Sequence, residues 1–141
     1  MKVLGIDPGF RACGVAYFDG VWQAVTVRPK GRGLWPRVCE ILRVLGPVTV
    51  DVLVVERPQI YEQRLMKGDP NDEVMLAVLV GALARHVTAT KVLLPTPHDW
   101  KGQTPKDISH ARIRKRLPAL GVCSKDALDA VGLALYGVDH A

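Results

Sequence analysis

Two acidic residues stand at the ends of apolar runs that the sequence predicts to be strands. Asp7 follows residues 3–6 and precedes Pro8-Gly9, and Glu56 follows residues 52–55. Burying an unpaired carboxylate is costly, so a buried strand gains nothing from an acid at its tip. Asp before Pro-Gly is also a common turn-former, so Asp7 either caps a turn or holds a cation. If the two strands are neighbours, both carboxylates lie at one edge of a sheet.

A third acidic element supplies Asp126 and Asp129 near the C-terminus. Residues three apart share one face of a helix, so both carboxylates would point the same way. Acids in the first turn of a helix often serve only to stabilise its dipole. Asp129, however, stands among Ala, Leu, Val and Gly, where a solvated side chain is out of place.

Four convergent carboxylates are suited to divalent cations with oxygen ligands. Mg²⁺ prefers such hard ligands and keeps several waters or substrate oxygens. Two ions about 3.5–4 Å apart can activate a water and stabilise the leaving oxygen of a phosphodiester. Without a cation the four acids would repel one another and would also repel DNA. The sequence therefore predicts a site for two Mg²⁺ ions, with Mn²⁺ as a substitute, at Asp7, Glu56, Asp126 and Asp129.

The elements that would position these acids follow the order β-β-β-α-β-α-β-α-α. Asp19-Gly20 between two β-prone runs predicts a hairpin, so the first three strands form an antiparallel meander. The later strands join through crossovers that make them parallel. The fourth strand, residues 51–56, is apolar without alternation, which is typical of a strand buried on both faces. We expect an α/β fold with a mixed sheet between helices.

The helices are predicted from apolar spacing and from their caps. Asp69 and Ser124 are expected N-caps, and Gly46-Pro47 ends the helix that begins near Leu34. The helix from Val74 to Ala84 is apolar nearly all round, which indicates burial on more than one side. The remaining predicted elements are a strand at 90–94, a basic helix at 104–117 and a final helix from 124 to about 137.

Composition narrows the class of protein. The chain has 141 residues, 48% of them hydrophobic, which suits one folded domain over residues 1–141. Lys and Arg outnumber Asp and Glu by 19 to 14, which favours a polyanionic partner such as nucleic acid. Cys13, Cys39 and Cys123 form no Cys-x-x-Cys pair, which argues against a zinc site and favours a reducing cytoplasm. The longest apolar run is shorter than the ~20 residues of a membrane span.

Basic residues near the third acidic motif predict contacts with a phosphate backbone. Lys106, His110 and Arg114 are four apart and share a helical face, and Lys101 precedes them. The alternative is a solvated helix surface, which we prefer for Lys115 and Arg116. Further DNA contacts are predicted at these positions: Arg11, Tyr61, Arg64 and Lys67.

Three neighbouring features have structural interpretations. Arg57 could simply neutralise Glu56, and His98 with Asp99 is more often a surface pair than an acid–base pair. Cys13 and Cys123 fit small core positions better than nucleophiles.

The three acidic motifs in order resemble the RuvC family of Holliday-junction resolvases, within the RNase H-like (retroviral integrase) superfamily. The motifs are Gly5-Ile6-Asp7-Pro8-Gly9, Val54-Val55-Glu56 and Lys125-Asp126-Ala127-Leu128-Asp129. The short chain is closest to phage-type members. The resemblance implies an RNase H-like fold, a five-stranded mixed sheet flanked by helices in which the first and fourth strands are adjacent. It also implies a two-Mg²⁺ site formed by the four acids.

The same resemblance implies a crossover junction endodeoxyribonuclease. Family members act as dimers that nick two opposed strands of a four-way DNA junction, with the helix Val74 to Ala84 at the dimer interface and Lys101 and Lys106 near the cleaved strand. They commonly carry an aromatic residue three positions after the glutamate. Here that position is Gln59, and the nearest aromatic is Tyr61. The expected setting is the cytoplasm of a bacterium or of a phage-infected host.

Three alternatives remain open from the sequence. A nuclease of the same fold could act on other branched DNA or on structured RNA, because the acids do not specify the substrate. A non-catalytic nucleic-acid-binding module is a second alternative, although a binder gains nothing from four acids. An actin-like or sugar-kinase-like phosphoryl transferase also opens with a Gly-Ile-Asp strand, but it needs two lobes where 141 residues supply one.

Overall fold

The computed structural model describes residues 1–62 and 68–141 as five strands and five helices. The strands are β1 (Val3–Asp7), β2 (Cys13–Phe18), β3 (Trp22–Val27), β4 (Thr49–Val55) and β5 (Thr88–Leu93). The helices are α1 (Leu34–Leu45), α2 (Pro70–His86), α3 (Pro97–Lys101), α4 (Lys106–Arg116) and α5 (Lys125–Asp139).

The strands form one mixed sheet in the order β3-β2-β1-β4-β5. β1, β2 and β3 are an antiparallel meander, while β4 pairs in parallel with both β1 and β5. The predicted mixed sheet is confirmed, and so is the adjacency of its first and fourth strands. In the described residues no helix is long and apolar enough to cross a membrane.

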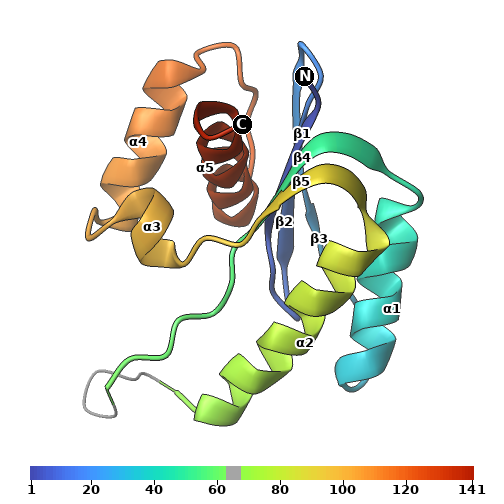
Figure 1. Ribbon diagram of the computed structural model, residues 1–141. Helices are drawn as coiled ribbons and strands as arrows, with labels where there is room; N and C mark the ends of the chain where they lie inside the picture. The colour runs from blue at the N-terminus through green and yellow to red at the C-terminus, as the bar shows by residue number, and fades with distance from the viewer. Residues whose placement is uncertain (63–67) are drawn as a thin grey trace.

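Helices cover both faces of the sheet. Figure 1 shows α1 and α2 on one side and α3, α4 and α5 on the other. Side chains alternate between the faces of a strand. In β1 and β4, Leu4, Ile6, Leu53 and Val55 belong to the core under α1 and α2. Val3, Val52 and Val54 belong to the core under α5. The prediction that β4 is buried on both faces is confirmed.

Helix α5 lies unusually close to the sheet because glycines face it. A Cβ atom on Gly5 would overlap the Ala130 carbonyl oxygen, and one on Gly14 would overlap the Asp126 carbonyl oxygen. The helix contributes small residues such as Ala130 and Ala134 to the same contact. The backbone of α5 can therefore approach the ends of β1 and β2, which brings its first turns to the edge where β1 ends.

The observed elements depart from the predicted ones in three places. The short helix α3 was not predicted, because five residues are too few to show an apolar period. A capping box defines it: Thr96 accepts from the Asp99 N–H, and Asp99 accepts from the Thr96 N–H. Asp99 is thus a capping residue rather than half of an acid–base pair. β4 ends at Val55, one residue before Glu56, and β5 begins at Thr88 directly after α2.

Helix α2 is less buried than its composition predicts. Only Leu79, Val80 and Leu83 are buried, whereas Val74 is 63% exposed and Val78 is 43% exposed. The prediction of burial on several sides is wrong for the single chain, because α2 packs through one face onto the sheet and α1. An apolar stripe is left facing outward.

Candidate active site

The parallel pairing of β1 and β4 brings Asp7 and Glu56 to the same edge of the sheet. Ile6 lies opposite Val55 in the ladder, and the Glu56 N–H donates to the Ile6 carbonyl oxygen at 3.2 Å. By the alternation of strand side chains, Asp7 shares a face with Val3 and Glu56 shares a face with Val54. Both strand-end acids therefore lie on the side of the sheet that α5 covers.

The first turns of α5 add the other two acids. Gly14 is the partner of Asp7 in the β1–β2 ladder and also faces the Asp126 carbonyl. Ser124 begins the helix by accepting from the Ala127 N–H at 3.2 Å, and its hydroxyl also pairs with that of Thr26 in β3. Asp129 follows one turn later and is 4% exposed.

The electrostatics of Asp7 show that the four acids share one neighbourhood. The pKa of Asp7 is raised to about 8, first by burial and then by the charges of Glu56, Asp129 and Asp126, while Lys106 lowers it. Nearby like charges raise the pKa of a carboxyl only when they lie close to it. The structure therefore brings together all four acids that the sequence singled out.

Glu56 is held by side chains of α3. The indole N–H of Trp100 donates to Glu56 Oε2 at 2.6 Å, and Lys101 Nζ lies 3.9 Å from the same oxygen. Burial raises the pKa of Glu56, and these two partners counteract part of the rise. The Nε of Arg57 donates to the Leu94 carbonyl at 3.0 Å, and the described ion pair of Glu56 is with Lys101 rather than Arg57.

Asp129 is held on both of its oxygens by side chains of α4. Lys106 Nζ lies 2.7 Å from Oδ2, and His110 Nε2 lies 2.7 Å from Oδ1. Partial burial lowers the pKa of Lys106, but the hydrogen bond and charge of Asp129 raise it more, so the net shift is upward. The chain thus places one of its own cations among the acids.

One predicted DNA contact is incompatible with the structure. His110 was placed with Lys106 and Arg114 on an exposed strip, but it is only 8% exposed and turns inward to Asp129. The shared helical face was predicted correctly for Lys106 and His110. Its direction was wrong, because spacing alone does not show which face of a polar helix meets the core.

The donor set fits a divalent cation in its chemistry. Burial and the three neighbouring acids disfavour the charge of Asp7, and a bound cation would relieve this condition. Within residues 1–62 and 68–141, however, no three His, Cys, Asp or Glu side chains already enclose a metal position. Trp100, Lys101, Lys106 and His110 occupy oxygens of Glu56 and Asp129. A cation at the cluster would therefore require carboxylates to turn toward it.

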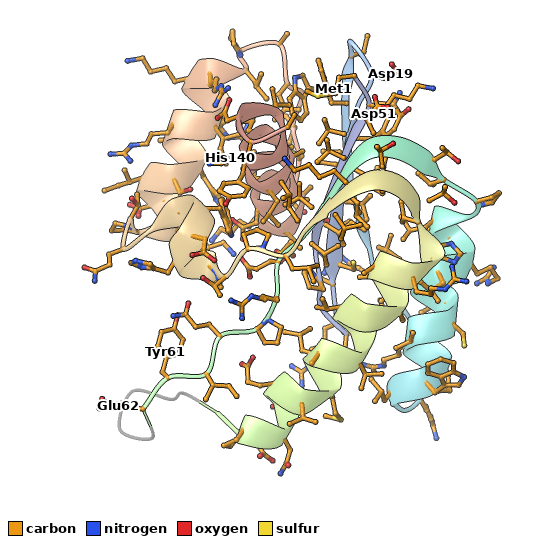
Figure 2. The ribbon with its side chains drawn as sticks, viewed as in Figure 1. Met1, Asp19, Asp51, Tyr61, Glu62 and His140 are labelled. Carbon is orange, nitrogen blue, oxygen red and sulfur yellow. The ribbon has the colours of Figure 1, made fainter. Side chains whose placement is uncertain are left out.

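The remaining predicted contacts are spread around this edge. Arg11 is exposed and lines a cleft of about 840 Å³ that also reaches Asp126. Arg114 is exposed on α4. Tyr61 is 44% exposed on the segment that leaves β4, away from the sheet (Figure 2), and its hydroxyl donates to Gln59. Arg64 and Lys67 lie outside the described residues.

Trp100 is the site residue that sequence reasoning missed. Contacts are predicted from the sequence at Lys101 and Lys106, and no role is assigned to the neighbouring Trp100. A Trp beside a Lys and ahead of a basic helix is an available signal, but nothing local links it to a glutamate 44 positions earlier. That link exists only in the folded chain.

The sheet order and the helices on both of its faces define an RNase H-like fold, as expected. Among solved structures, one of T. thermophilus RuvC in complex with a Holliday junction substrate is similar, with a TM-score of 0.59 and 19% identity over 96% of this chain and 91% of that chain. A second Thermus thermophilus RuvC structure has a TM-score of 0.58 and 21% identity over 96% and 92% of the two chains. No protein-family model matches the sequence, and no curated protein matches it.

Proposed function

We propose that this chain is a metal-dependent endonuclease that resolves four-way DNA junctions by paired nicks, and that residues 1–141 form one nuclease domain. The observation that carries the proposal is the meeting of four acids from three separate elements on one edge of the sheet, with lysines beside them. The likeness of the fold to a RuvC structure that holds a Holliday junction substrate supports the choice of substrate.

Asp7, Glu56, Asp126 and Asp129 are the proposed ligands of two Mg²⁺ ions, with Mn²⁺ as a substitute. Bound there, divalent ions would offset the charge of the acids and help to activate water against a phosphodiester. The chain's own part is to place oxygen ligands from β1, β4 and α5 at fixed positions. The low exposure of Asp129 also keeps bulk water from screening the site.

Basic side chains would align the phosphate backbone with these acids. Lys106 and Lys101 lie beside Asp129 and Glu56, where an ammonium can offset negative charge that develops on a phosphate. Farther out, the exposed Arg11 and Arg114 would contact flanking phosphates. Tyr61, together with Arg64 and Lys67, is proposed to meet the DNA near the branch point.

Paired nicking needs two active sites, and we propose a homodimer formed through α2. The outward stripe of that helix includes Val74, Met75 and Val78, which are all exposed in the single chain. Surfaces of this kind mark interaction sites. A second copy packed there would bury the face that the sheet leaves open.

A synthetic four-way junction incubated with protein and Mg²⁺ tests the proposal. Wild type should nick two opposed strands. Asp7→Asn should retain junction binding, but its cleavage rate should fall by at least about 100-fold, because it removes a ligand to the metal. Asp51→Asn is the matched control, since Asp51 is an exposed acid of β4 that bonds the Lys2 N–H away from the site.

The outcomes separate the alternatives. Absence of nicking by wild type, or equal nicking by Asp7→Asn, contradicts the proposal. Duplex, flap and structured RNA substrates at the same salt concentration test the nuclease alternatives. If the protein cleaves one of these substrates faster than the junction, that substrate replaces the junction in the proposal. Tight binding of the junction without cleavage of any substrate would favour the alternative of a non-catalytic nucleic-acid-binding module.

A further inference from the structure

Trp100 makes the shortest described hydrogen bond to Glu56. Its indole nitrogen lies 2.6 Å from Glu56 Oε2, which is shorter than the ~2.9 Å of an ordinary N–H···O bond. An indole donates one hydrogen bond and accepts none. Trp100 can therefore hold the glutamate, but it cannot bind a cation itself.

Helix α5 contains a slot for the Trp100 ring. A Cβ atom on Gly132 would lie 2.5 Å from Cζ3 and 3.2 Å from Cη2 of Trp100. Glycine inside a helix is less favourable than alanine, so its presence at this contact indicates a need for space. Gly132 lies three residues after Asp129 and hence on the same face of the helix. The indole thus sits between Glu56 and the helix that carries Asp126 and Asp129.

Helix α3 gives the ring a fixed mounting. The capping box joins the Thr96 N–H to Asp99 Oδ2 at 2.7 Å and the Asp99 N–H to Thr96 Oγ1 at 3.3 Å, one residue before Trp100. Lys101 Nζ lies 4.8 Å from the centre of the indole and 3.9 Å from Glu56 Oε2. The indole ring packs against Gly132, its helix is fixed by the capping box, and its N–H is bound by Glu56.

We propose that Trp100 is a positioning residue that aims the Glu56 carboxylate. The indole N–H engages Oε2 and fixes the rotation of the carboxylate, so that Oε1 remains available to a divalent cation. This inference rests on the proposed function of the four acids as metal ligands. Because the indole is uncharged, it orients the carboxylate without competing for the cation's place as an ammonium does.

The variant Trp100→Phe tests this role with a matched control. Phenylalanine keeps an aromatic ring for the Gly132 slot but has no N–H to donate. The affinity of the DNA-free protein for Mn²⁺, measured by calorimetry, should fall about 10- to 100-fold, the usual loss when a partner that orients a metal ligand is removed. Trp35→Phe, at an exposed tryptophan of α1, should leave it unchanged. Equal Mn²⁺ affinity in wild type and Trp100→Phe overturns the inference.

A spectroscopic measurement covers the case in which Trp100→Phe does not fold. The chain has three tryptophans, so Trp22→Phe with Trp35→Phe leaves Trp100 as the sole one. Its emission should shift on addition of Mg²⁺, and the shift should vanish when Glu56→Gln is added. An unchanged emission in a protein that calorimetry shows to bind Mg²⁺ overturns the inference.

Junction cleavage by the same proteins separates the two proposals. Wild type that binds Mn²⁺ through a Trp100-dependent Glu56 but does not cut a junction would keep this inference and overturn the proposed function. If wild type cuts junctions and Trp100→Phe has the same Mn²⁺ affinity as wild type, the proposed function stands and the role of Trp100 is overturned. Wild type that binds no Mn²⁺ overturns both.

Discussion

At the scale of single residues, the acids of the site are paired with the chain's own donors. Asp129 receives an ammonium from Lys106 and a ring nitrogen from His110 at 2.7 Å each. Lys106 is half exposed at its side chain, while His110 is buried. The two partners therefore differ in how readily they leave. Lys106 is the one that a divalent cation would displace.

Lys106→Met should tighten Mn²⁺ binding to the DNA-free protein. Removal of the competing ammonium favours the ion by about two- to fivefold, the range covered by one partly exposed ion pair. Cleavage should nevertheless slow, because a cation near the phosphate is lost. Calorimetry and a junction assay measure the two effects. Lys115→Met, on the exposed face of α4, is the control, and weaker Mn²⁺ binding by Lys106→Met would contradict the competition.

Asp7 should make the protein less stable as pH rises when a chelator removes divalent ions. Burial raises its folded pKa to about 8 from 3.8, so the folded state keeps a proton that the unfolded state loses between these values. The stabilisation that Asp7 contributes is fully present below its unfolded pKa and is lost as pH rises through its folded pKa. Asp7→Asn should therefore be more stable than wild type near pH ~8. Its free energy of unfolding should be higher by roughly 0.5–2 kcal/mol, a usual gain at a strained functional site.

Urea titrations at several pH values measure this difference. It should disappear only well below pH 3.8, the unfolded pKa of Asp7, where the wild-type carboxyl is protonated in both states. Addition of Mg²⁺ at the higher pH should also narrow it, because the ion stabilises only the wild-type site. A difference that grows as pH falls would contradict the assigned burial of Asp7.

Residue types alone identified the acids but not their partners. Asp7 and Glu56 were recognisable because carboxylates at the ends of apolar strands are costly unless they are used. Trp100 was missed and His110 was misplaced, since their roles depend on α3 and α4 docking against α5. Such packing between distant segments leaves no periodic signal in the sequence.

At the scale of elements, the close approach of α5 to β1 and β2 decides whether the acids meet. Gly14 allows that approach, because the Asp126 carbonyl occupies the place of its missing Cβ. Strand order then places Glu56 beside Asp7, since β4 lies next to β1 and not at an edge of the sheet. The geometry of the site is therefore a consequence of backbone contact as much as of side-chain chemistry.

Gly14→Ala should push α5 away from the sheet. Overpacking at a backbone contact costs about 1–3 kcal/mol, and the shift of Asp126 should also weaken Mn²⁺ binding. Chemical denaturation and calorimetry measure the two changes. Gly121→Ala, where a Cβ meets nothing within 4 Å, is the control and should change neither. A Gly14→Ala protein with wild-type stability and Mn²⁺ affinity would contradict the close packing.

The elements with strong local signals were predicted well, and the short one was not. Asp19-Gly20, Gly46-Pro47 and the N-caps Asp69 and Ser124 marked turns and helix ends that the structure contains. Helix α3 carried only a capping box over five residues. The apolar circumference of α2 was read as burial within the chain, whereas one stripe of it faces outward.

At the scale of the whole molecule, that outward stripe is the basis for the proposed dimer. Val78→Glu places a charge on this stripe, and burying an unpaired charge in an interface is strongly unfavourable. Sedimentation should show wild type as a dimer and this variant as a monomer at equal concentration. Val21→Glu, at a 69% exposed position between β2 and β3, is the matched control. Wild type sedimenting as a monomer would contradict the dimer.

The account depends on the four acids acting together on divalent cations. Anomalous diffraction from crystals of the wild-type protein soaked in Mn²⁺ tests this directly. We expect Mn²⁺ peaks among Asp7, Glu56, Asp126 and Asp129, within about 2.0–2.4 Å of carboxylate oxygens, and with Lys106 turned away from Asp129. Mn²⁺ bound only elsewhere on the protein, with these four carboxylates unliganded and Lys106 still paired to Asp129, would contradict the account.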